Sequence, residues 1–163
     1  MPVKNKKTGT RETLRVLFIG DIMGKPGRKA VAALLPDLRN EYSVDVVLAN
    51  AENLAHGKGI TTLTTDELKK SGVDFCTSGN HIWAKPEGVG ILDAADPYVI
   101  RPANYPSGTP GSGHKVLAIG NFRLLVVNLM GRVFMRESLD CPFRALDVIL
   151  EGNTPEELDA IIV

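Results

Sequence analysis

The chain has 163 residues, and its 19 Lys and Arg side chains balance its 19 Asp and Glu side chains, so its formal net charge is zero. That length is enough for one domain with its own hydrophobic core. Zero net charge excludes an overall electrostatic attraction to nucleic acid or to an anionic membrane, and no apolar run approaches the about 18 residues that a transmembrane helix needs. We therefore expect neither membrane insertion nor stable nucleic-acid binding.

The start of the chain differs from the rest. Residues 1–11, MPVKNKKTGTR, carry four basic side chains and no acidic one, and they lack the apolar core of a signal peptide. We predict a flexible basic tail over residues 1–13 and one domain over residues 14–163; a phosphate-binding arm is the alternative for the tail. The two cysteines, Cys76 and Cys141, are far apart and form no CxxC motif, which favours reduced thiols and a cytoplasmic protein.

Three apolar runs in the first half of the domain predict buried strands, at residues 14–21, 44–53 and 73–78. Helical patterns separate these runs. The resulting strand–helix–strand–helix–strand order favours right-handed crossovers and a parallel sheet that is covered on both faces. The predicted fold class is therefore α/β.

Two helices are predicted between these strands. The first starts at Arg28, after a break at Pro26, because apolar residues then recur at helical spacing and give the helix one face that we expect to be buried, namely Val31, Leu34, Leu35 and Leu38. The second covers about residues 65–70, because Thr64 and Glu67 form a capping-box pattern.

The second half of the domain has loop and hairpin patterns. Residues 98–115 are rich in Pro and Gly and predict an ordered, irregular loop, and Gly120-Asn121 between two apolar runs predicts a hairpin. Residues 142–151 predict a helix that buries Phe143, Leu146 and Leu150. The last segment, TPEELDAIIV, predicts a helical turn with Pro155 in its first position, followed by the start of a strand.

Polar residues follow each of the three predicted parallel strands, as Gly20-Asp21, Glu52-Asn53 and Gly79-Asn80-His81. The carboxyl ends of parallel strands share one edge of a sheet, so these side chains could converge there. Glycine at positions 20 and 79 would let the backbone turn sharply. Carboxylate, amide and imidazole ligands suit divalent metal ions, and one carboxylate can bridge two ions roughly 3.5–4 Å apart.

Each of these residues also has a structural explanation. Asp21 could cap a helix, Glu52 and Asn53 could be solvated loop residues, Asn80 could form an Asx turn, and His81 could be a surface or core imidazole. The three motifs together, each at a strand end, favour a site. Trp83 is expected to pack over apolar surface beside it.

Other segments allow further hypotheses. GDIMGKPGR invites a phosphate-loop interpretation, but its spacing is one residue short and Pro26 stands where Ser or Thr is needed. His56 and Lys58, in a small glycine-rich loop, could contact a substrate phosphate, or the loop could simply be exposed. Arg101 and Arg132 could bind an anion or have a structural role.

Five segments together resemble the YmdB-like branch of the calcineurin-like metallophosphoesterases, namely LFIGDIMGKPGR, NAENLAHGKGIT, SGNHIWAK, RPANYPSGTPG and NLMGR. The resemblance extends from about Leu14 to Val163, and the joint pattern is far more specific than any one motif. It implies a four-layer α/β sandwich with two divalent metal ions, iron or manganese, and phosphodiesterase activity on substrates such as 2′,3′-cyclic nucleotides. Asp21, Glu52, Asn53 and Asn80 would then be metal ligands, with Glu52 bridging, and His81 would donate a proton to the leaving oxygen.

The chain departs from the family pattern in one respect. Asp-Phe-His and Gly-Thr-His-Thr-His segments, which would complete the two metal sites, are not found in it, and neither His56 nor His114 matches their positions. We therefore expect an N-terminal portion of a metallophosphoesterase, incomplete at its C-terminus, truncated and weakly active or inactive, with homo-oligomers or another association covering the missing half. A non-catalytic module that binds a nucleotide or a protein is the alternative function.

Overall fold

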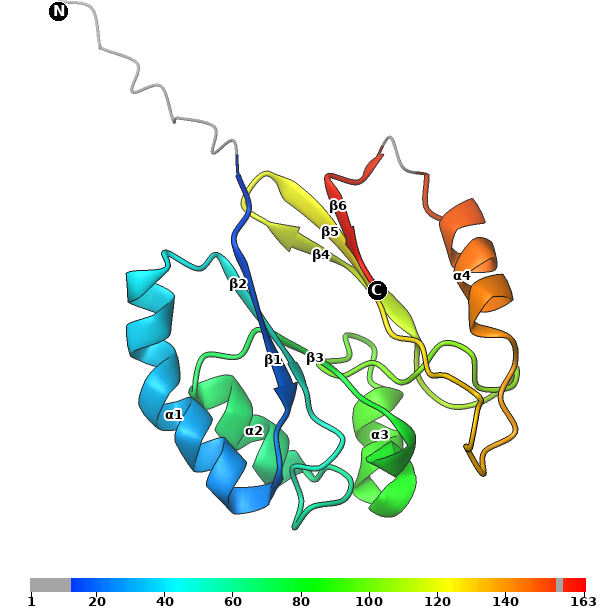
Figure 1. Ribbon diagram of the computed structural model, residues 1–163, viewed down its shortest axis with the longest axis horizontal. Coiled ribbons are helices and arrows are strands. Elements are labelled where there is room, and N and C mark those ends of the chain that lie inside the picture. The colour runs from blue at the N-terminus through cyan, green and yellow to red at the C-terminus, as the bar shows by residue number, and fades with distance from the viewer. Residues whose placement is uncertain (1–12, 155–156) are drawn as a thin grey trace, which may run out of the picture.

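The computed structural model describes residues 13–154 and 157–163 (Figure 1). The predicted tail therefore lies outside the described residues, apart from Thr13, and so does the predicted helical position of Pro155. Within the described ranges, none of the helices combines the length and the apolar character needed to cross a bilayer.

The first three strands form a parallel sheet, as the sequence predicts. β1 (Val16–Asp21), β2 (Val46–Asn50) and β3 (Phe75–Thr77) lie in the order β1-β2-β3. β2 is central and almost fully buried, whereas β1 is an edge strand whose Phe18 is 46% exposed. The prediction that all three strands are buried is therefore wrong for β1, because a partner covers only one of its edges.

Two helices connect these strands, and both start earlier than predicted. α1 (Gly24–Glu41) includes Pro26, because a proline in the first turn has no helical hydrogen bond to lose. α2 (Thr62–Lys70) is capped by Thr61, whose side chain accepts from the backbone of Thr64 while the Thr64 hydroxyl accepts from the backbone of Thr61. The predicted capping box of Thr64 and Glu67 is therefore wrong. The box starts one turn earlier, with Thr61 as the N-cap and Thr64 at the third helical position.

The second half forms a second sheet and a helix. β4 (His114–Ile119) and β5 (Phe122–Val127) make the predicted hairpin, and β6 (Ala160–Ile162) pairs with β5 in parallel. α4 (Pro142–Glu151) has the predicted bounds, but it buries Ile149 and leaves Phe143 78% exposed. The prediction for Phe143 is wrong, as is the one for Leu34, which is 59% exposed on α1.

The elements stack in four layers (Figure 1). Alternate residues of β2 point to opposite faces: Val47 and Ala49 pack with the helices α1 and α2, while Val46 and Leu48 pack against the second sheet through Leu124 and Val126. The outer face of the second sheet packs on α4. The first sheet is covered on both faces as predicted, by helices on one side and by a sheet on the other.

The end of β3 leads into the segment of most interest for function. A 3-10 helix, η1 (Asn80–Ala84), follows Gly79 directly, and the short helix α3 (Glu87–Leu92) comes next. Residues 98–100 then run beside β3 through a bridge between Cys76 and Val99, and the predicted irregular loop leads from there to β4.

Candidate metal and catalytic site

The structure brings residues from all three strand ends together, and Asn53 joins them. Its Nδ2 donates to Oδ2 of Asp21 at 2.8 Å, and its Oδ1 lies 2.6 Å from Nδ1 of His81. Asn53 is only 4% exposed, whereas Asp21 at the end of β1 is exposed. A buried amide therefore links an accessible carboxylate to an imidazole 60 positions away along the chain.

Glu52 lies beneath the turn that carries His81. Its Oε2 accepts the backbone N–H of His81 at 3.0 Å and lies 3.8 Å from Nδ1 of the same residue. Asn50, at the end of β2, donates to Oε1 of Glu52 at 3.3 Å and accepts the Glu52 backbone N–H at 3.0 Å. These hydrogen bonds fix a carboxylate whose side chain is only 15% exposed.

Gly79 has a different role from the one predicted. Its φ of −143° lies outside the left-handed region that favours glycine, so a left-handed turn is not what requires glycine there. A β-carbon at this position would instead collide with the Glu52 carboxylate. Glycine is needed because the backbone passes directly against Glu52.

The hydrogen bonds of Asn53 define the tautomer of His81. Because Nδ2 of Asn53 faces the Asp21 carboxylate, its carbonyl oxygen faces Nδ1 of His81, and a carbonyl oxygen can only accept. Nδ1 therefore carries a proton. Nε2 is the ring nitrogen left to exchange a proton with a ligand.

Asn80 contacts a residue that the sequence did not suggest. Its Nδ2 donates to Oε1 of Glu137 at 3.2 Å, across 57 positions of the chain. The backbone N–H of Glu137 itself, together with the Asn80 amide, lowers the pKa of this carboxyl below its usual range.

Two buried asparagines hold the loops around the site. Nδ2 of Asn128 donates to the carbonyl of Ser78 at 2.7 Å, just before the Gly79 turn, and to that of Ile100 at 3.3 Å. Asn104 is fully buried and holds both ends of the loop over residues 131–139, by donating to the carbonyls of Met130 and Asp140. RPANY and VVNL contain these residues, but neither motif indicates such a role.

Trp83 packs beside the site, as predicted. Its ring meets that of Tyr105 edge to face, with centroids 5.5 Å apart. Burial raises the pKa of the Tyr105 hydroxyl, and the negative charges of Glu137 and Glu52 raise it further. Tyr105 therefore lies within electrostatic reach of the same carboxylates.

The residues present partly fit a divalent metal centre. Asp21, Glu52, Asn53 and Asn80 offer carboxylate and amide oxygens, the ligand chemistry of Mn²⁺ and Fe²⁺, and Asn53 keeps a second lone pair on its bonded oxygen. In residues 13–154 and 157–163, no group of three or more His, Cys, Asp or Glu side chains could hold a metal ion. The chemical types of these four side chains suit a divalent metal ion, but four ligands are too few to complete the coordination of two ions.

The phosphate contacts expected of His56 and Lys58 stay a prediction, since their loop directly follows Glu52 and Asn53. Both side chains are exposed, and none of the hydrogen bonds or ion pairs between described residues joins them to the site. The Gly59 N–H closes their loop by donating to the backbone carbonyl of Glu52 at 2.6 Å. The phosphate-loop interpretation also lacks a free backbone cradle, because Gly24 N–H donates to the Asn53 carbonyl at 2.9 Å.

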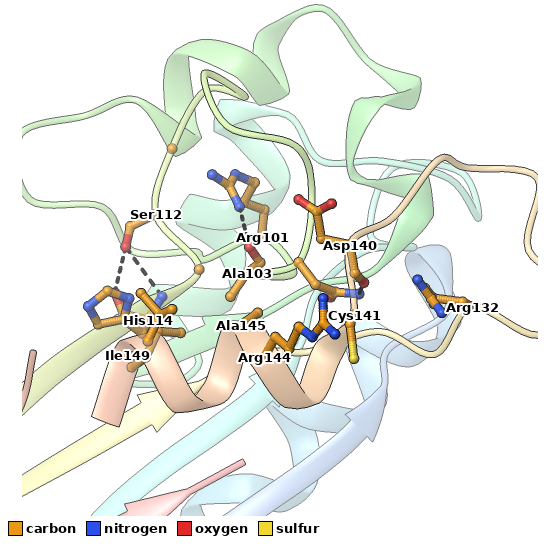
Figure 2. Close-up of a pocket in the computed structure, with 14 residues that line it drawn as sticks. Arg101, Ala103, Ser112, His114, Arg132, Asp140, Cys141, Arg144, Ala145 and Ile149 are labelled. Carbon is orange, nitrogen blue, oxygen red and sulfur yellow. Dashed lines mark hydrogen bonds between the residues drawn. The ribbon is translucent and has the colours of Figure 1, made fainter. Parts of the chain in front are cut away.

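A cavity of about 740 Å³ lies elsewhere, between the loop after Ile100 and the start of α4 (Figure 2). Arg101 and Arg132 both line it, but the Arg101 guanidinium donates to the carbonyls of Pro102, Thr109 and Pro110 and is structural. Figure 2 shows Arg132 and Arg144 on either side of Cys141. The cavity does not include the strand-end cluster.

The family model of YmdB-like proteins matches residues 17–163. The chain belongs to the YmdB-like family. This YmdB-like chain is 42% identical over 137 residues to the 2′,3′-cyclic-nucleotide 2′-phosphodiesterase of Bacillus subtilis, covering 84% of the chain and 51% of that protein. It spans about half the length of the curated relatives it matches.

Two crystal structures resemble the YmdB-like chain closely. A hypothetical protein of Thermus thermophilus is 48% identical with a TM-score of 0.80, over 86% of this chain and 54% of the other. A novel phosphatase of Mycoplasma pneumoniae is 28% identical with a TM-score of 0.79, over 86% of this chain and 52% of the other. The chain thus has the metallophosphoesterase α/β sandwich, of which it covers about half, and membership of this family implies divalent metal cofactors.

Proposed function

We propose that the strand-end cluster belongs to a dinuclear phosphodiesterase centre that hydrolyses small phosphodiesters, specifically 2′,3′-cyclic nucleotides. The observation that carries the proposal is the pair of bonds made by Asn53, which ties the exposed Asp21 carboxylate to the imidazole of His81. The identity to a Bacillus subtilis 2′,3′-cyclic-nucleotide 2′-phosphodiesterase supports the substrate class.

Asp21, Glu52, Asn53 and Asn80 would hold divalent ions, manganese or iron. When bound, such ions polarise phosphoryl oxygens and lower the pKa of an attacking water. Four oxygen donors are fewer than two ions with five or six ligands each require. We therefore expect this chain alone to hold metal weakly and to turn over slowly.

His81 would supply the proton to the departing oxygen. Asn53 holds Nδ1–H, and Glu52 holds the backbone N–H of the same residue, so the ring is fixed, and Nε2 has no hydrogen bond to any described residue. Water would attack phosphorus and form a new P–O bond as the P–O2′ bond breaks, and Nε2–H of the cationic ring would give its proton to the leaving 2′ oxygen, so that a 3′-nucleotide forms and the proton of the attacking water passes to solvent. The imidazole then recovers its proton from solvent.

The test is hydrolysis of 2′,3′-cyclic AMP by the chain in Mn²⁺, with the product identified by chromatography. We expect slow formation of 3′-AMP that EDTA abolishes. His81→Ala should reduce the turnover rate by about 10²–10⁴-fold. The control is Asp37→Asn, which replaces an exposed carboxylate on α1 and should leave the turnover rate unchanged.

Two results would contradict the proposal. Turnover that persists in EDTA would exclude the metal centre, and equal turnover by wild type and His81→Ala would exclude the proton donor. Binding of Mn²⁺ or nucleotide by the wild type without any product would favour the non-catalytic binding module.

A further inference from the structure

The side chain of Asn80 is held by a carboxylate from a remote loop. Glu137 lies in the segment between β5 and α4, and its Oε1 accepts a hydrogen bond from Nδ2 of Asn80 at 3.2 Å. The Asn80 side chain makes no other hydrogen bond to the described residues. The amide is therefore oriented by one contact, made from outside its own turn.

The orientation of an amide decides whether it can bind a cation. The amide nitrogen has only donor hydrogens, whereas the carbonyl oxygen has two lone pairs. An acceptor on the nitrogen side fixes that end and turns the oxygen to the opposite side. We propose that Glu137 is a positioning residue that orients Asn80 so that its Oδ1, and not its Nδ2, faces the metal; this inference rests on the metal centre proposed above.

The loop that carries Glu137 is held at both ends. The fully buried Asn104 donates through Nδ2 to the Met130 carbonyl at 2.8 Å and to the Asp140 carbonyl at 3.0 Å. Its Oδ1 accepts the Met130 N–H at 3.0 Å, and its carbonyl accepts the Asp140 N–H at 2.8 Å. Four hydrogen bonds to one residue thus set where the loop, and with it Glu137, meets the site.

Glu137 could also act simply through its negative charge, and two substitutions separate these effects. Glu137→Gln removes the charge but keeps a carbonyl oxygen that can accept from Asn80. Glu137→Ala removes both. Glu151→Ala, at the exposed end of α4, is the matched control for loss of a glutamate.

The experiment is titration of the 163-residue chain with Mn²⁺, with free Mn²⁺ measured by electron paramagnetic resonance. We expect Glu137→Ala to weaken Mn²⁺ binding by about 10-fold, while Glu137→Gln and Glu151→Ala stay close to wild type. In the metal-free chain, the NMR signal of the Asn80 side-chain amide, assigned by its loss in Asn80→Asp, should shift in Glu137→Ala and keep its position in Glu137→Gln.

Each other result overturns the inference in a different way. Equal weakening by Glu137→Gln and Glu137→Ala would show that charge acts and orientation does not. Wild-type affinity in Glu137→Ala, or an unmoved Asn80 amide signal, would exclude a positioning role and leave the metal centre intact. No Mn²⁺ binding by the wild type would overturn the metal centre and this inference together.

Discussion

A β-carbon at position 79 would lie 2.6 Å from Oε2 of Glu52 and closer still to Oε1. The backbone of one strand end therefore passes directly over the carboxylate of the next. That contact allows Oε2 of Glu52 to reach the backbone N–H of His81. Close approach of the two turns, rather than flexibility, makes glycine necessary at this position.

Gly79→Ala is expected to destabilise the chain and to disturb the site. The Glu52 carboxylate is fixed by hydrogen bonds from Asn50 and His81, so the added methyl group can be accommodated only by displacing it or the backbone. We expect a loss of about 1–3 kcal/mol in the free energy of unfolding, measured with urea, and weaker Mn²⁺ binding.

Gly90→Ala is the matched control. Apart from its chain neighbours and the backbone of its own helix α3, no described residue has an atom within 4 Å of a β-carbon at Gly90, so alanine should be neutral or stabilise by about 0.5–1 kcal/mol. Equal effects of the two substitutions would contradict the close approach at Gly79.

Asn128→Ala is expected to loosen the turn that presents the site. Without the Asn128 amide, the Ser78 carbonyl loses its 2.7 Å partner, whereas the Ile100 carbonyl still accepts from the Ser78 hydroxyl at 2.8 Å. One buried unsatisfied carbonyl should cost about 1–3 kcal/mol in urea unfolding. Asn40→Ala, on the exposed side of α1, is the control and should leave the free energy of unfolding unchanged. An unchanged free energy of unfolding in Asn128→Ala would show that the hydrogen bonds of the Asn128 amide do not stabilise the chain.

The two thiols are expected to react very differently with iodoacetamide. Burial raises the pKa of Cys76 to about 12, so it should react only after unfolding. The backbone N–H groups of Arg144 and Phe143, at the start of α4, lower the pKa of Cys141, and the charges of Arg132 and Arg144 add to this. Because the thiolate reacts, alkylation of Cys141 should rise with pH and persist at lower pH than for an ordinary thiol.

Mass spectrometry of peptides from the labelled native chain checks this. Cys141→Ser should abolish native-state labelling. Labelling of Cys76 in the folded chain, or a Cys141 profile identical to that of free cysteine, would contradict the assigned environments.

The sequence predicts the sheet and the place of the site because both depend on local patterns. Asp21, Glu52 and His81 each follow an apolar run that forms a parallel strand, and the carboxyl ends of such strands meet. The structure confirms the strand order and brings these residues together. Their roles as ligands and proton donor stay predictions.

What the sequence did not indicate depends on contacts between distant segments. Glu137 lies in an irregular loop with no periodicity, 57 positions from Asn80, and Asn104 and Asn128 resemble ordinary loop and strand-end asparagines. Phe143 fits the apolar pattern of α4, yet the second sheet packs against Ile149 and leaves the side of the helix that carries Phe143 exposed. Such choices are made by tertiary packing, which single-sequence patterns do not contain.

The most direct test of the proposed metal centre is Mn²⁺ binding by the wild-type chain and by Glu52→Gln, measured as free Mn²⁺ by electron paramagnetic resonance. Glu52→Gln keeps the shape and a carbonyl acceptor for the His81 N–H but removes the carboxylate, and Asp37→Asn is the control for loss of a remote charge. We expect saturable binding by the wild type and by Asp37→Asn, and loss of binding in Glu52→Gln. Equal Mn²⁺ affinity in the wild type and in Glu52→Gln would contradict a metal centre built on the Glu52 carboxylate.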